Sequence, residues 1–226
     1  MPLNKDQVDA LADAIRNYDY PRVTYDFQHK KEIQHFSMRQ LESSIREDLI
    51  SGDPFRVKDG LSSVLYWGYY RFGYRGKRVN NFRNKITEQG LALAAQTLQS
   101  LSGAGLQTLK ELGLPQFSKV TFLSKVRMFL APQHYVVLDK GLVEGLKNTE
   151  PVTLFQKVKV DTSIPVTPEN ELLYQRWCNL CEEAVKKYFQ GQDFLAVDVE
   201  RGVWHLVKNS QHEEAANIIV NIEEPK

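Results

Sequence analysis

The stretch from Leu112 to Val143 constrains the fold most, because turns marked by proline separate its apolar segments at short intervals. A Leu-Pro turn at Pro115 precedes an amphipathic helix that we expect to start near Ser118. A second turn at Pro132 leads through a short apolar run to Asp139, which stands where a further helix is expected to begin. Short segments of this kind, each with its own turn, favour a chain built from many packed helices.

Apolar residues recur at helical spacing through most of the remaining chain. We expect further helices to begin at Asn4, at Ser37, at Gly90 (with an end at Gly103), at Pro168 and at Asp198. Residues 22–36 give no clear signal, and the apolar run 218–222 predicts a short strand or loose packing. The sequence therefore predicts a mainly α protein of about eight to ten helices with little or no β structure. It forms either one unit over residues 1–226 or two lobes, of about 1–100 and 101–226, that flank a cleft.

Composition places the chain among ordinary globular proteins. With 226 residues, of which 42% are hydrophobic and 25% charged, it can bury a core without disulfides or metal ions. Its first residues have the pattern of an amphipathic helix rather than of a signal peptide, and no apolar run reaches the length of a membrane span. Low cysteine usage is typical of a reducing compartment, so we expect a cytoplasmic protein without a membrane partner.

The side chains give little support to metal or cofactor chemistry. Cys178 and Cys181 form a single C-x-x-C pair, for which buried apolar packing is favoured over a redox or zinc role. Two thiols cannot supply the ligands of an iron–sulfur cluster. The histidines show no HxxxH or HExxH pairing, and there is no Walker-type loop. We therefore expect no metal, no nucleotide cofactor and no other cofactor.

The window from Tyr66 to Lys85 is both basic and aromatic. Six positive residues stand in it with no acid among them: Arg71, Arg75, Lys77, Arg78, Arg83 and Lys85. Seven aromatic residues are interleaved with them: Tyr66, Trp67, Tyr69, Tyr70, Phe72, Tyr74 and Phe82. Positive side chains neutralise phosphates, and aromatic faces stack on exposed bases, so the window predicts contact with nucleic acid. The alternative is a helix with core aromatics, followed by a solvated basic loop.

Two lysines and an aspartate in the first stretch have the chemistry of a catalytic pair. On a helix from Ser118, an apolar face would carry Phe122 and Phe129, while Lys125 would lie outside the core, on the opposite side, which is exposed or faces a cleft. Lys119 would stand at the start of the same helix. A deprotonated lysine can attack a sugar C1′ and displace a base, and Asp139 at a helix N-terminus could stabilise the positive charge that develops. The alternative is a solvated lysine and an aspartate that serves only as an N-cap.

Three short motifs carry a resemblance to a known family. The turn Leu114-Pro115 precedes a helix that carries Ser124-Lys125-Val126-Arg127-Met128-Phe129. A second turn follows as Pro132-Gln133-His134-Tyr135-Val136-Val137-Leu138-Asp139, and Asp198-Val199-Glu200-Arg201-Gly202-Val203-Trp204 lies near the C-terminus. This layout resembles the helix-hairpin-helix DNA glycosylase superfamily, and within it a bacterial subgroup with the 8-oxoguanine DNA glycosylase fold. The similarity touches residues from about 60 to 207.

The resemblance implies an enzyme that removes a damaged or modified base from duplex DNA. It implies that Asp139 is catalytic and that either Lys125, with Lys119 in reserve, or water attacks C1′. Attack by the lysine would also permit strand cleavage. The implied DNA contacts are Trp67, Arg71, Arg75, Lys77, Arg78, Arg83, Ser118 and Lys119, with the flipped base stacked on Trp67 or Phe72. The chain departs from the family in its hairpin, which lacks the usual glycines, and at Thr121, which occupies the usual lysine position. A non-catalytic DNA-binding relative and a helical protein-interaction module remain alternative functions.

Overall fold

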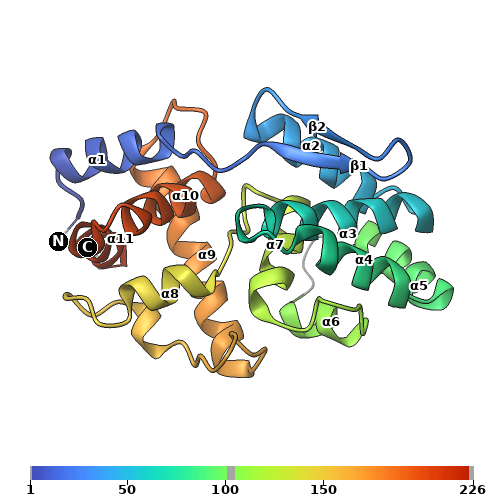
Figure 1. The fold of residues 1–226 in the computed structure, drawn as a ribbon. Helices are drawn as coiled ribbons and strands as arrows, with labels where there is room; N and C mark the ends of the chain where they lie inside the picture. Colours follow the sequence, from blue (N-terminus) through green and yellow to red (C-terminus); the bar gives the residue numbers. More distant parts are fainter. Residues whose placement is uncertain (1, 101–104, 224–226) are drawn as a thin grey trace. The chain divides into compact units, whose positions relative to one another are not determined.

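The computed structural model describes residues 2–100 and 105–223 of the chain. These residues form eleven α-helices, two short 3-10 helices and one two-stranded sheet (Figure 1), which confirms the mainly α class. No helix among them is both long and apolar enough to cross a membrane. The expected helix end at Gly103 lies outside the described residues. The last element before Gly103 is α5 (Glu88–Ser100).

The chain divides into two compact units. The central unit is Tyr20–Ala131, and the terminal unit combines Met1–Asp19 with Pro132–Lys226. The boundaries between the units lie after Asp19 and after Ala131 rather than near residue 100. The reason is that the first helix packs on a helix from the end of the chain and not on its neighbours in sequence. The central unit is thus an insertion between the two segments of the terminal unit.

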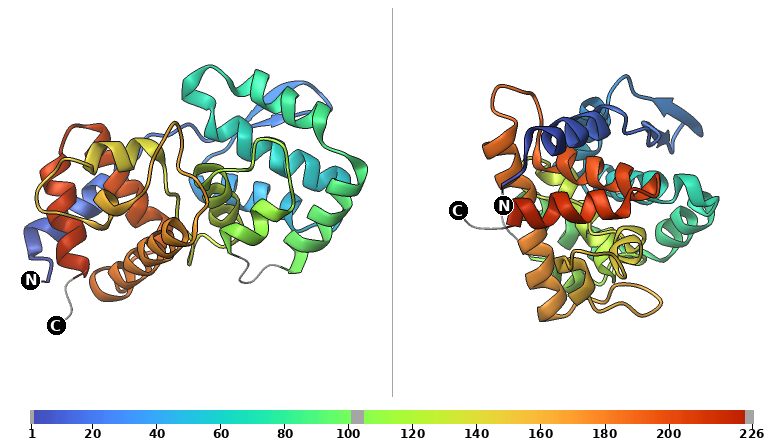
Figure 2. Two further views of the ribbon diagram at one scale, coloured as in Figure 1. Left: turned by 90° about the horizontal axis from the view of Figure 1, so that it is seen from below. Right: turned by 90° about the vertical axis from the view of Figure 1, so that its left-hand side faces the viewer.

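In the terminal unit, α1 (Lys5–Arg16) lies along α10 (Ala196–Lys208), as Figures 1 and 2 show. The close approach depends on Gly202, where a Cβ atom would stand 2.8 Å from Cγ1 of Ile15. Around α10 pack α8 (Lys140–Leu146), α9 (Pro168–Tyr188) and α11 (His212–Glu223), and a 3-10 helix, η2 (Leu154–Lys157), packs on α8 and α9.

The central unit is built around α3 (Pro54–Gly68), which is buried without a break from Gly60 to its end. The hairpin of β1 (Val23–Asp26) and β2 (Lys31–Gln34) pairs Thr24 with Ile33, and β1 packs on α3. The remaining elements are α2 (Met38–Leu49), η1 (Tyr70–Phe72), α4 (Arg75–Lys85), α5, α6 (Leu106–Glu111) and α7 (Val120–Leu130). Because α2, α4, α5 and α7 all contact α3, its side chains form the core of this unit.

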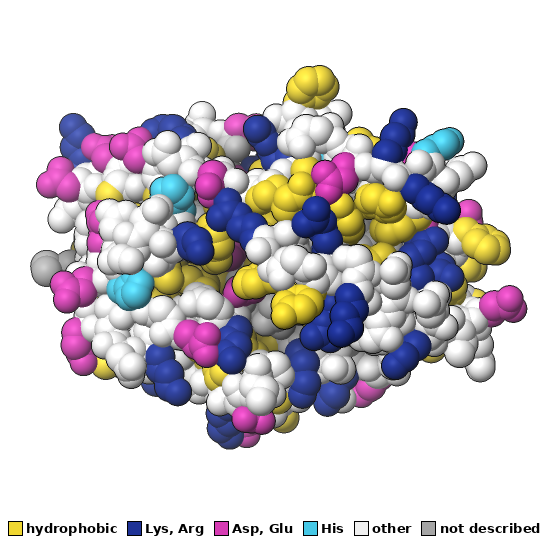
Figure 3. Space-filling model, viewed as in Figure 1, with side chains coloured by type: hydrophobic (Ala, Val, Ile, Leu, Met, Phe, Trp, Pro, Cys, Tyr) yellow, Lys and Arg dark blue, Asp and Glu magenta, His cyan; other side chains and the backbone are white. Residues whose placement is uncertain are grey.

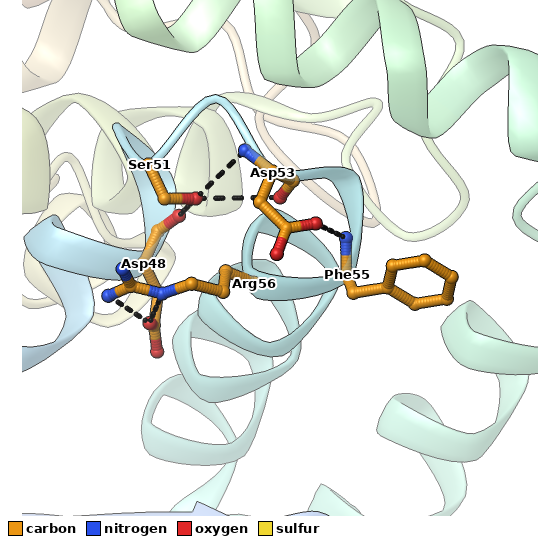
Figure 4. Close-up of polar contacts among 5 residues, drawn as sticks. All are labelled: Asp48, Ser51, Asp53, Phe55 and Arg56. Atoms are coloured by element: carbon orange, nitrogen blue, oxygen red, sulfur yellow. Dashed lines mark hydrogen bonds and ion pairs between the residues drawn. The ribbon is translucent and has the colours of Figure 1, made fainter.

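The turn between α2 and α3 is fixed by its own polar groups (Figure 4). The Ser51 hydroxyl donates to the carbonyl of Asp48 at 2.9 Å, and Asp53 Oδ1 accepts the amide of Phe55 at 2.9 Å, which caps α3. Arg56 binds the Asp48 carboxylate with two nitrogens at 3.0 Å each, while the ring of Phe55 points away from this network. The polar residues thus end one helix and start the next, as the Ser-Gly-Asp-Pro sequence predicts.

The local signals at several helix starts are confirmed, and two predictions are wrong. Asn4 and Ser37 cap α1 and α2 by accepting the amide proton of the third residue of each helix. Asp198 is not the N-cap of α10, because the helix begins at Ala196 and its carboxylate instead accepts the amide of Leu195 at 2.8 Å. The run 218–222 is neither strand nor loose, because it forms part of α11 and buries its apolar side chains on one face.

Candidate nucleic-acid interface

Formal charge separates between the two units. The central unit carries 17 Lys and Arg residues against nine Asp and Glu, a net charge of +8, whereas the terminal unit carries 12 against 19, a net charge of −7. Over the helices of the central unit in Figure 3, dark blue basic side chains outnumber magenta acidic ones. The overall charge of +1 hides this separation. A unit of this charge attracts polyanions and repels basic partners.

Two aromatic rings stand exposed in the turn that joins α3 to α4. Phe72 is 64% exposed and Tyr74 58% exposed, and Gly73 between them has a φ of +70°, a conformation that side chains other than glycine rarely adopt. The Arg71 guanidinium lies 5.1 Å from the ring centre of the half-buried Tyr20. We name residues 69–75 the aromatic turn.

Arg75 holds the aromatic turn in place. Its guanidinium donates to the carbonyl of Tyr70 and to the hydroxyl of Tyr66, each at 3.1 Å, and approaches the Glu32 carboxylate at 3.4 Å. It also lies 4.3 Å from the ring centre of Tyr70. Burial of the Tyr66 hydroxyl, together with its hydrogen bond to Glu32, raises the pKa of Tyr66 to about 12. Arg75 is therefore an anchor of the turn, and only part of its charge faces the solvent.

The hairpin between α6 and α7 adjoins the basic face of α4. Pro115 and Gln116 are the middle residues of a turn that the amide of Phe117 closes on the carbonyl of Leu114 at 3.1 Å, and Gln116 has a φ of +72°. This is the conformation of a type II turn, in which glycine usually stands at the second middle position. Arg78 of α4 donates to the side-chain oxygen of Gln116 at 3.1 Å. One exposed surface therefore joins α4 to the hairpin.

Three further predicted contacts lie on this surface. Lys77 on α4 is exposed, and so are Ser118 and Lys119 at the end of the hairpin. Lys119 occupies the N-cap position of α7 with extended backbone and makes no capping bond through its side chain. Together with Arg78, these side chains place positive charge and a hydroxyl group around the turn at Pro115. We name these four residues, together with Gln116, the hairpin surface.

Other predicted contacts have structural partners. Arg83 donates to Asp59 at 2.5 Å and to Ser62 at 3.2 Å, and its guanidinium lies 4.4 Å from the ring centre of Phe27. Glu32 and Asp59 therefore compensate part of the charge of the basic window, although both acids stand outside it in sequence. The predicted solvated basic loop is also wrong, because residues 75–85 form α4.

Trp67 lies in the core of the central unit and cannot stack on a base in this conformation. It is 4% exposed, its indole nitrogen donates to the carbonyl of Pro21 at 3.0 Å, and its ring packs edge-on against Tyr20 and Phe129. Of the two aromatic residues that the resemblance offered for stacking, only Phe72 is exposed. α3 ends at Gly68, between Trp67 and Phe72, so the two residues do not lie on one helix.

The prediction that Lys125 lies outside the core, on the exposed or cleft side of its helix, is wrong. Lys125 is 5% exposed, because α7 is covered by α2, α3 and α6 on several sides. Its side chain runs past Gly68, where an added Cβ atom would approach its Cδ to 3.2 Å, and its ammonium nitrogen lies 5.3 Å from the ring centre of Phe122. Ser124 and Met128, which lie on the same side of α7 as Lys125, are fully buried.

Asp139 is the N-cap of α8, as its position in the sequence predicts. Its Oδ1 atom accepts the amide of Gly141 at 2.8 Å, and its own backbone is extended. Asp139 belongs to the terminal unit, whereas Lys119 and Lys125 belong to the central unit. The structure thus gives Asp139 a role in helix capping and gives Lys125 a place inside the central unit.

The two cysteines lie side by side in the core of the terminal unit. Cys178 and Cys181 are free thiols on α9 and both are fully buried, as the packing interpretation predicts. Burial raises the pKa of Cys181 well above its usual range. Within the described parts of the chain, no group of three or more His, Cys, Asp or Glu residues is arranged to hold a metal ion.

Comparison of the chain with protein-family models, with curated proteins and with solved structures found no match. The functional interpretation therefore depends on the surfaces described above. Two residues of these surfaces escaped sequence reasoning, namely Gln116 and Glu32. The local signal at Gln116 was the preceding Pro115, since proline is common at the first middle position of type I and type II turns. Glu32 had none, because its partners stand more than 30 residues away.

Proposed function

We propose that the central unit binds duplex DNA through the hairpin surface and the adjoining aromatic turn. The hydrogen bond between Arg78 and Gln116 carries the proposal, because it joins the basic side of α4 to the turn between α6 and α7. Phosphates are bound in proteins by arginine and lysine side chains, by hydroxyl groups and by backbone amides at turns and helix N-termini. The hairpin surface offers lysine and arginine side chains and a hydroxyl group, and it includes Lys119 at the N-terminus of α7.

The charge of the central unit supports a polyanionic ligand rather than a protein partner. A net charge of +8 on this unit would attract DNA over distances set by the ionic strength. Lys77 and Lys119 present their ammonium groups on the surface, where they would displace counterions from the phosphates. Arg83 would contribute mainly by holding α4 on α3, since it is bonded to Asp59.

The binding test compares two matched double variants of the full chain. Lys77→Ala with Arg78→Ala removes adjacent charges from α4, and Lys186→Ala with Lys187→Ala removes adjacent charges from α9 in the terminal unit. Affinity for a labelled duplex is measured by fluorescence anisotropy over a series of salt concentrations. We expect the double variant on α4 to lose about twofold to tenfold in DNA affinity for each charge removed at low salt. Its affinity should also fall less steeply as the salt concentration rises. Equal losses of affinity in the two variants would refute binding through the hairpin surface. No binding at low salt would refute DNA binding and favour a protein-interaction module.

A second candidate function is removal of a base, and it is favoured by the enclosed Lys125 on the helix after the hairpin. In this proposal the deprotonated lysine nitrogen bonds to C1′ while the bond from C1′ to the base breaks. The base leaves with the electron pair and takes up a proton. Loss of the proton from nitrogen, with opening of the sugar, then gives a Schiff base.

The catalytic candidate is tested by trapping the Schiff base. The protein is incubated with duplexes that carry different modified bases, and borohydride reduces any imine to a stable protein–DNA adduct. An adduct that disappears in Lys125→Ala, persists in Lys119→Ala and weakens in Asp139→Asn would support Lys125 as nucleophile. An adduct lost only in Lys119→Ala would assign the reaction to Lys119. DNA binding without any adduct or base release would leave a non-catalytic DNA-binding protein.

A further inference from the structure

We propose that the outer edge of β2 binds an extended, acidic polypeptide segment, which joins the hairpin as a third, antiparallel strand. β1 and β2 form a two-stranded sheet, and all four residues of β2 are exposed (Figure 1). A strand with one unpaired edge presents amides and carbonyls with which another chain can pair. The inference concerns a second ligand of the central unit and does not depend on DNA binding.

The register of the hairpin shows which backbone groups of β2 point outwards. Extended by one residue, it sets Arg22 opposite His35, whose amide donates to the carbonyl of Arg22 at 2.8 Å. Bonded and non-bonded pairs alternate along an antiparallel ladder, so Ile33 bonds to β1, whereas Glu32 and Gln34 do not. The amides and carbonyls of Glu32 and Gln34 therefore point away from β1, and within the described residues they have no hydrogen-bond partner.

The edge is held in place before a partner binds. At the turn between the strands, Asp26 Oδ1 accepts two backbone amides, at 2.9 and 3.0 Å. In the middle of β2, the Glu32 carboxylate accepts the hydroxyl proton of Tyr66 on α3. Beyond the end of β2, Arg22 donates to the carbonyl of Phe36 at 2.8 Å. Because the hairpin is fixed at three points, an added strand would spend little of its binding free energy on ordering it.

The side chains along the edge favour a segment with an apolar half and an acidic half. Lys30 and Lys31 are exposed at one end, and neither forms an ion pair within the described part of the chain. Towards the other end, Ile33 is 40% exposed and Phe36 is 91% exposed. Opposite charges and apolar pairs stabilise residues that face each other across strands. In an antiparallel partner, apolar residues opposite Ile33 would therefore precede acidic residues opposite the two lysines.

The alternating donors and acceptors of the edge argue against other ligands. Phosphates of DNA would bind the amides of Glu32 and Gln34 but would be repelled by their carbonyls, whereas a polypeptide backbone matches both. Pairing of β2 with a second copy of itself would bring together two central units that each carry a net charge of +8. The same charge attracts an acidic segment, and lysine on the edge strand opposes the self-pairing.

The binding test uses a labelled synthetic peptide of about eight residues, with isoleucine in its first half, aspartate in its second half and threonine between them. Fluorescence anisotropy measures its affinity for the full chain. We expect a peptide with lysine in place of aspartate to bind at least about tenfold more weakly. N-methylation of the two amides that face β2 should prevent binding, whereas N-methylation of the two alternate amides should change affinity by less than about threefold.

Variants of the full chain locate the site. Gln34→Pro removes an outward amide and leaves the bonds between β1 and β2 in place, so peptide affinity should fall at least about tenfold. Lys30→Glu with Lys31→Glu should reverse the preference, so that the lysine peptide binds more tightly than the aspartate peptide. Lys85→Glu with Lys110→Glu makes the same change of charge at two other exposed positions of the central unit, and should keep the preference for the aspartate peptide.

The pair of N-methylated peptides keeps the test decisive even if Gln34→Pro fails to fold. Equal binding of these two peptides, or of the aspartate and lysine peptides, would overturn the inference. So would an aspartate peptide that does not bind at about 1 mM. Sedimentation of the chain alone tests the remaining occupant, and we expect a monomer. A dimer that dissociates in Gln34→Pro would assign the edge to a second copy and would overturn the acidic partner.

Discussion

Two substitutions of Asp139 distinguish a role in capping α8 from a role in catalysis, because they affect the two roles differently. Asn caps helices as well as Asp does, since its side-chain oxygen also accepts an amide proton, whereas Ala cannot. In the structure the cap is one hydrogen bond of 2.8 Å to Gly141 at the start of a seven-residue helix. Asp139→Asn should therefore leave stability nearly unchanged, and Asp139→Ala should lower the free energy of unfolding by about 1 kcal/mol.

The expected loss is large enough to measure, because α8 buries Leu142, Val143 and Leu146 in the terminal unit. For a unit of this size, 1 kcal/mol corresponds to about 4 °C in the midpoint of thermal unfolding. Circular dichroism or calorimetry of the three proteins would measure it. An equal loss in both variants would show that the negative charge, not the hydrogen bond, stabilises α8. No loss in Asp139→Ala would refute the capping role, and a loss of base release in a stable Asp139→Asn variant would establish a chemical one.

Three further predictions follow from packing and from shifted pKa values. Gly202→Ala should destabilise the terminal unit by about 1 kcal/mol in denaturant unfolding, because overpacking against α1 costs about 1–3 kcal/mol and the gain in helix propensity offsets at most about 1 kcal/mol; an unchanged or higher midpoint would contradict this close packing. Tyr66 should stay protonated to about pH 12, so stability should fall as pH rises from the ordinary tyrosine pKa of about 10 towards 12, where the unfolded chain ionises first. NMR titration of labelled tyrosines checks this, with Tyr66→Phe to assign the late signal, and a tyrosine set that titrates entirely near pH 10 would disprove the burial beside Glu32. Cys178 and Cys181 should react with a thiol reagent only after unfolding, whereas fast labelling of the native protein would contradict their burial.

Local signals predicted much of the fold. Asn4 and Ser37 each stand before an apolar residue series and each accept amide protons at the start of a helix, because a short polar side chain satisfies donors that the helix leaves open. Residues 23–34 escaped prediction, because β2 is exposed along its whole length and so lacks the alternation that marks a half-buried strand. The pairing of β1 with β2 shows only in the structure.

The site was harder to predict than the fold, because tertiary packing decides which side chains face the solvent. The helical period of residues 118–130 predicted one buried face, but three helices cover α7 and enclose Lys125. Likewise the bond between Arg78 and Gln116 joins residues 38 positions apart, and nothing in either segment alone indicates it. The separation of charge into +8 and −7 followed only once α1 was seen to pack with the C-terminal helices.

The central claim is that DNA binds the hairpin surface and the aromatic turn of the central unit. Hydrogen–deuterium exchange of the full chain, with and without duplex DNA at low salt, locates the interface most directly. We predict that DNA slows exchange in peptides that cover residues 69–85 and 112–121, and that peptides from α9, α10 and α11 keep their rates. Protection confined to the terminal unit, or no protection at a DNA concentration that saturates binding, would contradict the claim.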